Sequence, residues 1–125
     1  MSRNWLRFTS GDVPVVSVRI GARRYFALID TGAAISFVMS DVSLKLGLPK
    51  EGFQNIVALN GQFETVPTVL LPAIGFGDVE LAPCRAGLRN LKPLGLGIEL
   101  LLGVNAFAAH CLQFDFREGR IYVVE

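Results

Sequence analysis

The chain carries little charge and no marked excess of either sign. Only 18% of its 125 residues are charged, and the formal net charge is +1. Proteins that bind nucleic acids usually present a strongly basic surface to the phosphates. The composition therefore gives no indication of a nucleic-acid partner, and bulk charge does not select the partner of this protein.

Long apolar runs are also missing. No segment approaches the roughly 18 to 20 apolar residues of a membrane-spanning helix, and residues 1–30 lack the apolar core of a signal peptide. With Met1 as the natural start, we expect a cytoplasmic protein without a membrane segment.

Cysteine and histidine are scarce. Cys84 and Cys111 stand far apart without a Cys-x-x-Cys spacing, and the single histidine, His110, precedes Cys111. Three scattered groups are weak support for a zinc site, and a chain of this length can build its core without a disulfide. We expect no metal, no cofactor and no structural disulfide.

What the chain does contain is a series of short apolar runs separated by turn residues. Val13–Ile20 is rich in β-branched residues, and Asn60-Gly61 between two strand-like runs favours a two-residue type I′ hairpin. A short helix is expected from a cap at Ser40 to a stop at Gly47. This spacing predicts one all-β domain, residues 1–125, built as a small barrel or sandwich.

One apolar run, YFALIDTGAAISFV (residues 25–38), contains a carboxylate. An ionised Asp is costly to bury unless it is paired or hydrogen-bonded. A strand that ends in Asp-Thr-Gly leaves the Asp30 carboxylate at its end, while Gly32 lets the backbone turn sharply. The alternative is that Asp30 only begins a turn between two strands.

A second motif, Leu101-Leu102-Gly103, follows some seventy residues later. The ordered set of Asp-Thr-Gly-Ala, a hairpin with Asn-Gly, and Leu-Leu-Gly resembles the retropepsin-like aspartic proteases, and the closing LQFDFREGRIYVV resembles their bacterial branch. The resemblance implies a closed acid-protease barrel with one or two short helices. It also implies a flap hairpin near Val57–Glu64. The implied catalytic residues are Asp30, Thr31 and Gly32, and the implied substrate-binding residues are Ala33, Ala34, Leu59, Asn60, Gly61 and Gln62.

The same resemblance implies how the protein works. Aspartic proteases use two carboxylates that share one proton, and this chain has a single Asp-Thr-Gly. We therefore expect a homodimeric aspartic endopeptidase that acts on extended, apolar segments of a protein or peptide substrate. Terminal segments near Trp5–Phe8 and Ile121–Glu125 are expected to widen the dimer interface, unless Trp5 only covers its own barrel.

The chain departs from the retroviral members at two positions. They commonly carry a carboxylate and an Arg that pair near the substrate, where this chain has Ala34 and Val104. Both members of the pair are absent, so neither leaves a buried unpaired charge, but a polar contact to substrate is lost. The alternatives are a non-catalytic dimeric binding or scaffold module that keeps the fold, and a protease restricted to one partner or to its own precursor.

Overall fold

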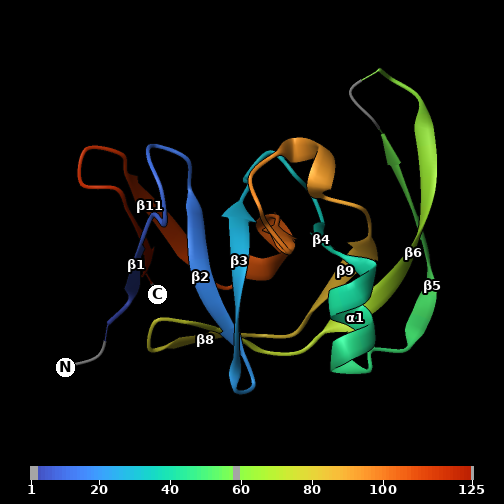
Figure 1. Cartoon of the computed structure of the whole chain (residues 1–125), viewed down its shortest axis with the longest axis horizontal. Helices are drawn as coiled ribbons and strands as arrows, with labels where there is room; N and C mark the ends of the chain where they lie inside the picture. Colours follow the sequence, from blue (N-terminus) through green and yellow to red (C-terminus); the bar gives the residue numbers. More distant parts are fainter. Residues whose placement is uncertain (1–2, 58–59, 125) are drawn as a thin grey trace.

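The computed structural model describes residues 3–57 and 60–124. Within these residues the chain forms twelve strands, one α-helix and two 3₁₀ helices (Figure 1). In chain order they are β1 (Trp5–Arg7), β2 (Val15–Ile20), β3 (Arg23–Ile29), β4 (Ser36–Val38), α1 (Ser40–Leu46), β5 (Lys50–Val57), β6 (Phe63–Leu71), β7 (Ile74–Phe76), β8 (Val79–Leu81), β9 (Cys84–Leu88), η1 (Lys92–Leu94), β10 (Leu100–Leu102), η2 (Val104–Phe107), β11 (Cys111–Asp115) and β12 (Arg120–Val124).

Nine strands form one curled sheet in the order β5-β6-β9-β4-β10-β3-β2-β7-β8 (Figure 1). Most neighbours are antiparallel, but β10 runs parallel to β3, and β4 runs parallel to β9. Strand β10 lies between β3 and β4, which are joined by the Asp30 loop. The fold therefore brings the two sequence motifs side by side, with Leu102 opposite Ile29.

A smaller sheet joins the two ends of the described chain. Its strand order is β1-β12-β11, with all neighbours antiparallel. Trp5 lies opposite Tyr122, and the Val123 N–H donates to the Asn4 carbonyl at 2.8 Å. The terminal strands thus pair within one chain.

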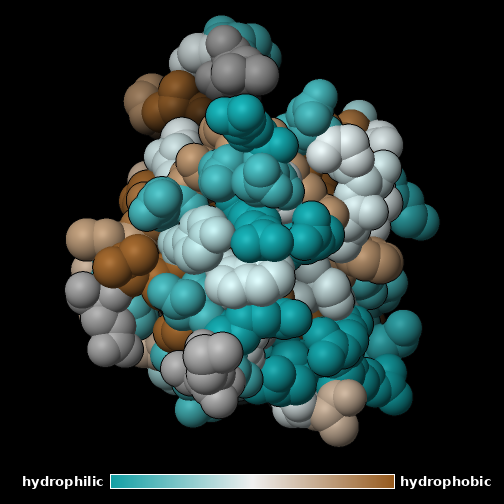
Figure 2. All heavy atoms as spheres, turned by 90° about the vertical axis from the view of Figure 1, so that its left-hand side faces the viewer, coloured by the Kyte–Doolittle hydropathy of each residue, from teal (hydrophilic) through white to brown (hydrophobic). Residues whose placement is uncertain are grey.

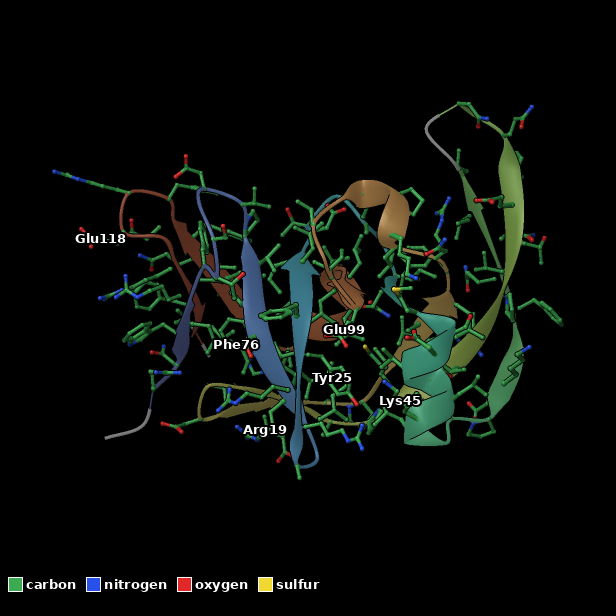
Figure 3. The ribbon with its side chains drawn as sticks, in the orientation of Figure 1. Arg19, Tyr25, Lys45, Phe76, Glu99 and Glu118 are labelled. Carbon is green, nitrogen blue, oxygen red and sulfur yellow. The ribbon has the colours of Figure 1, made fainter. Side chains whose placement is uncertain are left out.

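The core follows from the alternation of apolar residues along the strands. In β2, Val16 and Val18 are fully buried, and in β12 Ile121 and Val123 face the same interior. Figure 3 labels Tyr25 and Phe76, two aromatic members of this core. A second cluster, which includes Phe37, Ile98 and Leu101, lies beside the Asp30 loop.

The predicted class, all-β with short helices, is confirmed. The turns at Gly21 and Gly77 have positive φ, as tight hairpins require. Helix α1 ends at Gly47 as expected, but its N-cap is Met39, and no side chain caps this end.

The predicted two-residue turn at Asn60-Gly61 is wrong. Val57 pairs with Phe63, so the connection spans residues 58–62. Gly61 has a φ of 81°. The Asn60 side chain accepts a hydrogen bond from the Gln62 N–H at 3.0 Å.

Within the described ranges, no helix has the length and apolar character needed to span a bilayer.

Candidate active site

The Asp30 loop begins where β3 ends. The Asp30 N–H donates to the Leu102 carbonyl of β10 at 2.9 Å, which extends the β3–β10 ladder to the carboxylate-bearing residue. The chain then turns, because the Ala33 N–H donates back to the Asp30 carbonyl at 3.2 Å. The Gly32 N–H donates to Asp30 Oδ1 at 2.9 Å. This hydrogen bond holds the orientation of the Asp30 carboxylate.

Gly103 holds the loop from the other side. The Val104 N–H donates to the Ala33 carbonyl at 2.9 Å. A Cβ atom on Gly103 would lie 2.5 Å from the Ala33 carbonyl oxygen and 2.6 Å from that of Ile35. Only glycine permits this approach of two backbones, which explains why the Leu-Leu-Gly motif ends as it does.

A buried polar cluster lies behind the loop, and it was not foreseen from the sequence. The Ser36 hydroxyl is fully buried. It accepts from the Gly103 N–H at 3.0 Å and donates to Asn105 Oδ1 at 2.8 Å. The Asn105 amide donates in turn to the Arg85 carbonyl at 2.7 Å. These bonds connect β4, β9 and η2 with Gly103, the residue that follows β10.

Cys84 completes this cluster as a neutral thiol. Its side chain is buried, and its Sγ lies 3.9 Å from Ser36 Oγ. Burial raises the pKa of the Cys84 thiol, and the hydrogen bond to Ser36 lowers it by less. Both Cys84 and Cys111 are free thiols.

A groove of about 650 Å³ opens beside Asp30. Asp30 is partly exposed and lines this groove together with Ala33. The groove is also lined by three polar residues, Asn60, Arg89 and Asn90, while its apolar wall is formed by Phe37, Val57, Leu91, Pro93, Leu94 and Leu101. An apolar wall with a few polar groups is typical of a site that binds an extended peptide.

The β5–β6 hairpin forms one rim of the groove and rises beyond the sheet in Figure 1. A second hollow of about 460 Å³ lies between this hairpin and the Asp30 loop. Arg89 borders both hollows, with its guanidinium 5.5 Å from the centre of the Phe37 ring. Its Nη2 atom pairs with Glu64 Oε2 of β6 at 2.8 Å, so Arg89 connects the hairpin to the body of the protein.

The predicted substrate-binding residues divide into three groups. Ala33 and Asn60 line the groove beside Asp30, and Ala34 lines the second hollow. Gly61 and Gln62 lie in the hairpin connection and line neither hollow. Leu59 lies outside the described residues.

An aromatic patch, consisting of Phe8, Phe114 and Phe116, lies on the other side of the Asp30 loop. The Phe114 and Phe116 rings are stacked 5.7 Å apart, and Phe8 meets Phe116 edge-on at 5.8 Å. Phe116 is 57% exposed. A hollow of about 290 Å³ separates Phe114 and Phe116 from Asp30 and Thr31.

The described residues contain no group of three or more His, Cys, Asp or Glu side chains placed to hold a metal ion.

The fold is that of the retropepsin-like proteins. The structure superposes on a retropepsin-like aspartic protease from Rickettsia conorii with a TM-score of 0.65 at 12% identity, over 95% of this chain and 87% of that one. It also superposes on the retroviral protease-like domain of Ddi1 from Leishmania major with a TM-score of 0.57 at 11% identity, over 90% of this chain and 94% of that one.

The amino-acid sequence independently identifies the family. Residues 16–106 match the family model described as Aspartyl protease, and the chain belongs to this family. The matched range includes both the Asp30 loop and Gly103. No curated protein matches the chain.

Proposed function

We propose that this protein is an aspartic endopeptidase whose active site is completed by a second copy of the chain. The observation that carries the proposal is the placement of Asp30, which is partly exposed beside an apolar groove and accepts the Gly32 N–H. Family membership supports the same chemistry.

The chemistry requires two carboxylates. One Asp30 is ionised and takes a proton from water, whose oxygen attacks the carbonyl carbon of the substrate peptide bond. The partner's Asp30 is protonated and donates a hydrogen bond to the carbonyl oxygen. When the tetrahedral intermediate collapses, the C–N bond breaks and the leaving nitrogen receives a proton from the carboxyl pair. The two products are a carboxylic acid and an amine.

Two features support a second copy facing Asp30. The chain has one Asp-Thr-Gly, so a pair of such carboxylates requires two chains related by a two-fold axis. Thr31 is exposed at the tip of the loop, and we assign it a hydrogen-bonding role across that axis. The exposed Phe116 and the hollow beside Thr31 supply apolar surface at the same end of the molecule.

The substrate is an extended segment with apolar side chains. The groove wall offers them aliphatic and aromatic surface, and the β5–β6 hairpin offers a closing element. Ala34 and Val104 provide no polar contact to the substrate, so we assign recognition to the apolar wall and to backbone hydrogen bonds.

The test compares the wild-type protein with Asp30→Asn, which is nearly isosteric but cannot act as the base. We expect the wild type to cleave an unfolded protein substrate at some pH between acidic and neutral, and the variant to be inactive with the same thermal stability. A statine-containing peptide should bind the wild type and inhibit it. If neither form cleaves and the groove still binds extended peptides, the non-catalytic binding module is the better description.

A further inference from the structure

The arginines of this chain are distributed unevenly. Seven of its nine arginines lie on the half of the molecule made by β1, β2, β3 and the β11–β12 turn, whereas all three lysines lie elsewhere: Lys45 in α1, Lys50 in β5 and Lys92 in η1. Figure 2 shows a largely hydrophilic surface on the side where β1 and β11 lie. We use the name arginine surface for Arg3, Arg7, Arg19, Arg24 and Arg120 with Trp5.

Three guanidinium groups lie close to the indole ring of Trp5. The Cζ atoms of Arg120, Arg3 and Arg7 lie 4.3, 5.1 and 6.0 Å from the ring centre. Cation–π attraction holds these groups together despite their like charge. Arg and Trp are also the side chains most enriched at the energetic centres of protein interfaces.

Two pairs of these arginines lie directly opposite each other on neighbouring strands. Arg7 of β1 faces Arg120 of β12, and Arg19 of β2 faces Arg24 of β3. Like charges in directly opposite positions destabilise a sheet. A bound anion between the members of a pair would relieve this repulsion.

The nearby carboxylates do not neutralise the surface. Asp115 lies opposite Arg120 on β11, Glu118 lies in the following turn, and Asp78 accepts a hydrogen bond from the Arg3 backbone N–H. Glu80 of β8 lies opposite Gly75, the residue against which the Arg19 guanidinium packs. Nevertheless, within residues 3–57 and 60–124, none of the five arginines has a carboxylate oxygen within 4.0 Å of its side-chain nitrogens.

A hollow of about 240 Å³ lies within the surface. Arg3, Arg19 and Arg24 line it together with Ser17 and one acidic residue, Asp78. The Arg19 guanidinium lies against Gly75, where a Cβ atom would approach its Nη2 to 2.4 Å. The absence of a side chain at Gly75 thus leaves room for this guanidinium at the wall of the hollow.

We propose that the arginine surface binds an acidic segment of another polypeptide. A planar guanidinium group can donate two parallel hydrogen bonds to one carboxylate. The hollow has room for a side chain between the guanidinium groups of Arg3, Arg19 and Arg24. A polypeptide fits better than a nucleic acid because Asp78, Glu80, Asp115 and Glu118 are interspersed among the arginines. In a polypeptide, neutral residues can separate the carboxylates so that each meets an arginine, whereas a nucleic acid carries a phosphate at every nucleotide. This binding does not depend on Asp30.

The test measures fluorescence anisotropy of a labelled peptide of alternating glutamate and serine at low and moderate salt. We expect binding that weakens as salt rises. Arg7→Gln with Arg120→Gln, and separately Arg19→Gln with Arg24→Gln, should each weaken it at least about tenfold. Lys45→Gln with Lys50→Gln removes the same charge from the other half of the molecule, where Lys45 lies in Figure 3, and should leave binding nearly unchanged.

Several outcomes would overturn the proposal. They are no binding at low salt, equal loss in the lysine control, or tighter binding to single-stranded RNA or to anionic vesicles than to the peptide. Thermal melts of each double variant check folding, and relief of the like-charge pairs should not lower their stability. Asp30→Asn should bind the peptide as the wild type does. A negative result in this binding experiment therefore does not contradict the proposed proteolysis, and a negative cleavage result does not contradict peptide binding.

Discussion

Gly103 shows how much of the candidate site depends on a missing side chain. The Asp30 loop is held by a hydrogen bond from Val104 to Ala33, and this contact requires two backbones to approach at a position where no Cβ atom fits. The atoms that a Cβ would meet are backbone carbonyls, which cannot move aside as a flexible side chain can. The geometry of Asp30 is therefore coupled to residue 103.

We expect Gly103→Ala to lower both stability and activity. Overpacking of this kind costs about 1–3 kcal/mol of unfolding free energy, and a displaced loop can reduce turnover about a hundredfold. Urea denaturation and peptide cleavage measure the two effects. Gly21→Ala is the control, because Gly21 has a positive φ but open space around it. It should lose stability and keep its activity, and equal activity of the two variants would contradict the coupling.

Cys84 gives the fold a pH dependence at the alkaline end. Its thiol has a raised pKa in the folded protein, so its contribution to stability is fully present below the ordinary thiol value of about 9 and is lost as the pH rises through the folded value. We expect Cys84→Ala to flatten the decline of unfolding free energy above about pH 9. Cys111→Ala, which alters an exposed thiol, should decline as the wild type does.

Individual site residues were predictable only where the local sequence carries the signal. Asp30 and Gly32 interrupt an apolar run, and Gly103 ends another. Ser36 could not be identified, because its role depends on Gly103 and Asn105, which lie 67 and 69 positions away. A serine inside an apolar stretch has no feature that distinguishes it until the strands are paired.

At the level of elements, the base of the β5–β6 hairpin is held by the pairing of β6 with β9, and among the described residues one ion pair connects the hairpin to the body nearer its tip. Glu64 on β6 pairs with Arg89, which follows β9, and both side chains are partly exposed, at 50% and 39%. Exposed pairs of this kind contribute little to overall stability. Their effect is on the position of the hairpin over the groove.

We therefore expect Glu64→Gln to change the unfolding free energy by less than about 1 kcal/mol and to raise KM with little effect on kcat. The physical reason is that substrate binding must then order a hairpin that the ion pair no longer holds. Thr65→Val is the matched control, because it breaks a hydrogen bond from Thr65 to Asn55 inside the hairpin and leaves Arg89 alone. An equal rise in KM in both variants would contradict a specific role for the ion pair.

The strands and the helix were largely predictable because β-branched runs and glycine stops are local signals. The hairpin connection was not. Its register is determined by the pairing of Val57 with Phe63 and by the Asx turn at Asn60, which together override the usual Asn-Gly geometry.

At the level of the whole molecule, the proposal requires a site shared between two chains. We expect wild-type activity to fall when an excess of Asp30→Asn chains is added under exchanging conditions, because each mixed dimer holds one ionisable catalytic Asp. Activity should also fall on dilution below the dimer dissociation constant. Activity that follows only the amount of wild-type chain would rule out a shared site.

The surface of such a dimer was only partly predictable. Trp5 packs against Tyr122 of its own chain, with ring centres 6.5 Å apart, and Phe8 is buried. Their apolar character alone did not reveal which strand they would face, because the pairing spans almost the whole chain. Phe116 is an exposed aromatic that lines the hollow beside Asp30 and Thr31, and we expect it, rather than Trp5, to contact the second copy.

The pairing of β1 with β12 also determines the order in which a newly synthesised chain can be completed. Of the twelve described strands, β1 leaves the ribosome first, and its partner β12 leaves last. Until then β1 remains an unpaired edge, and charged residues such as Arg7 discourage such an edge from joining other nascent chains. The arginine surface is therefore completed late, because it needs Arg120 of β12. By that time all residues of the Asp30 loop and of β10 have already left the ribosome.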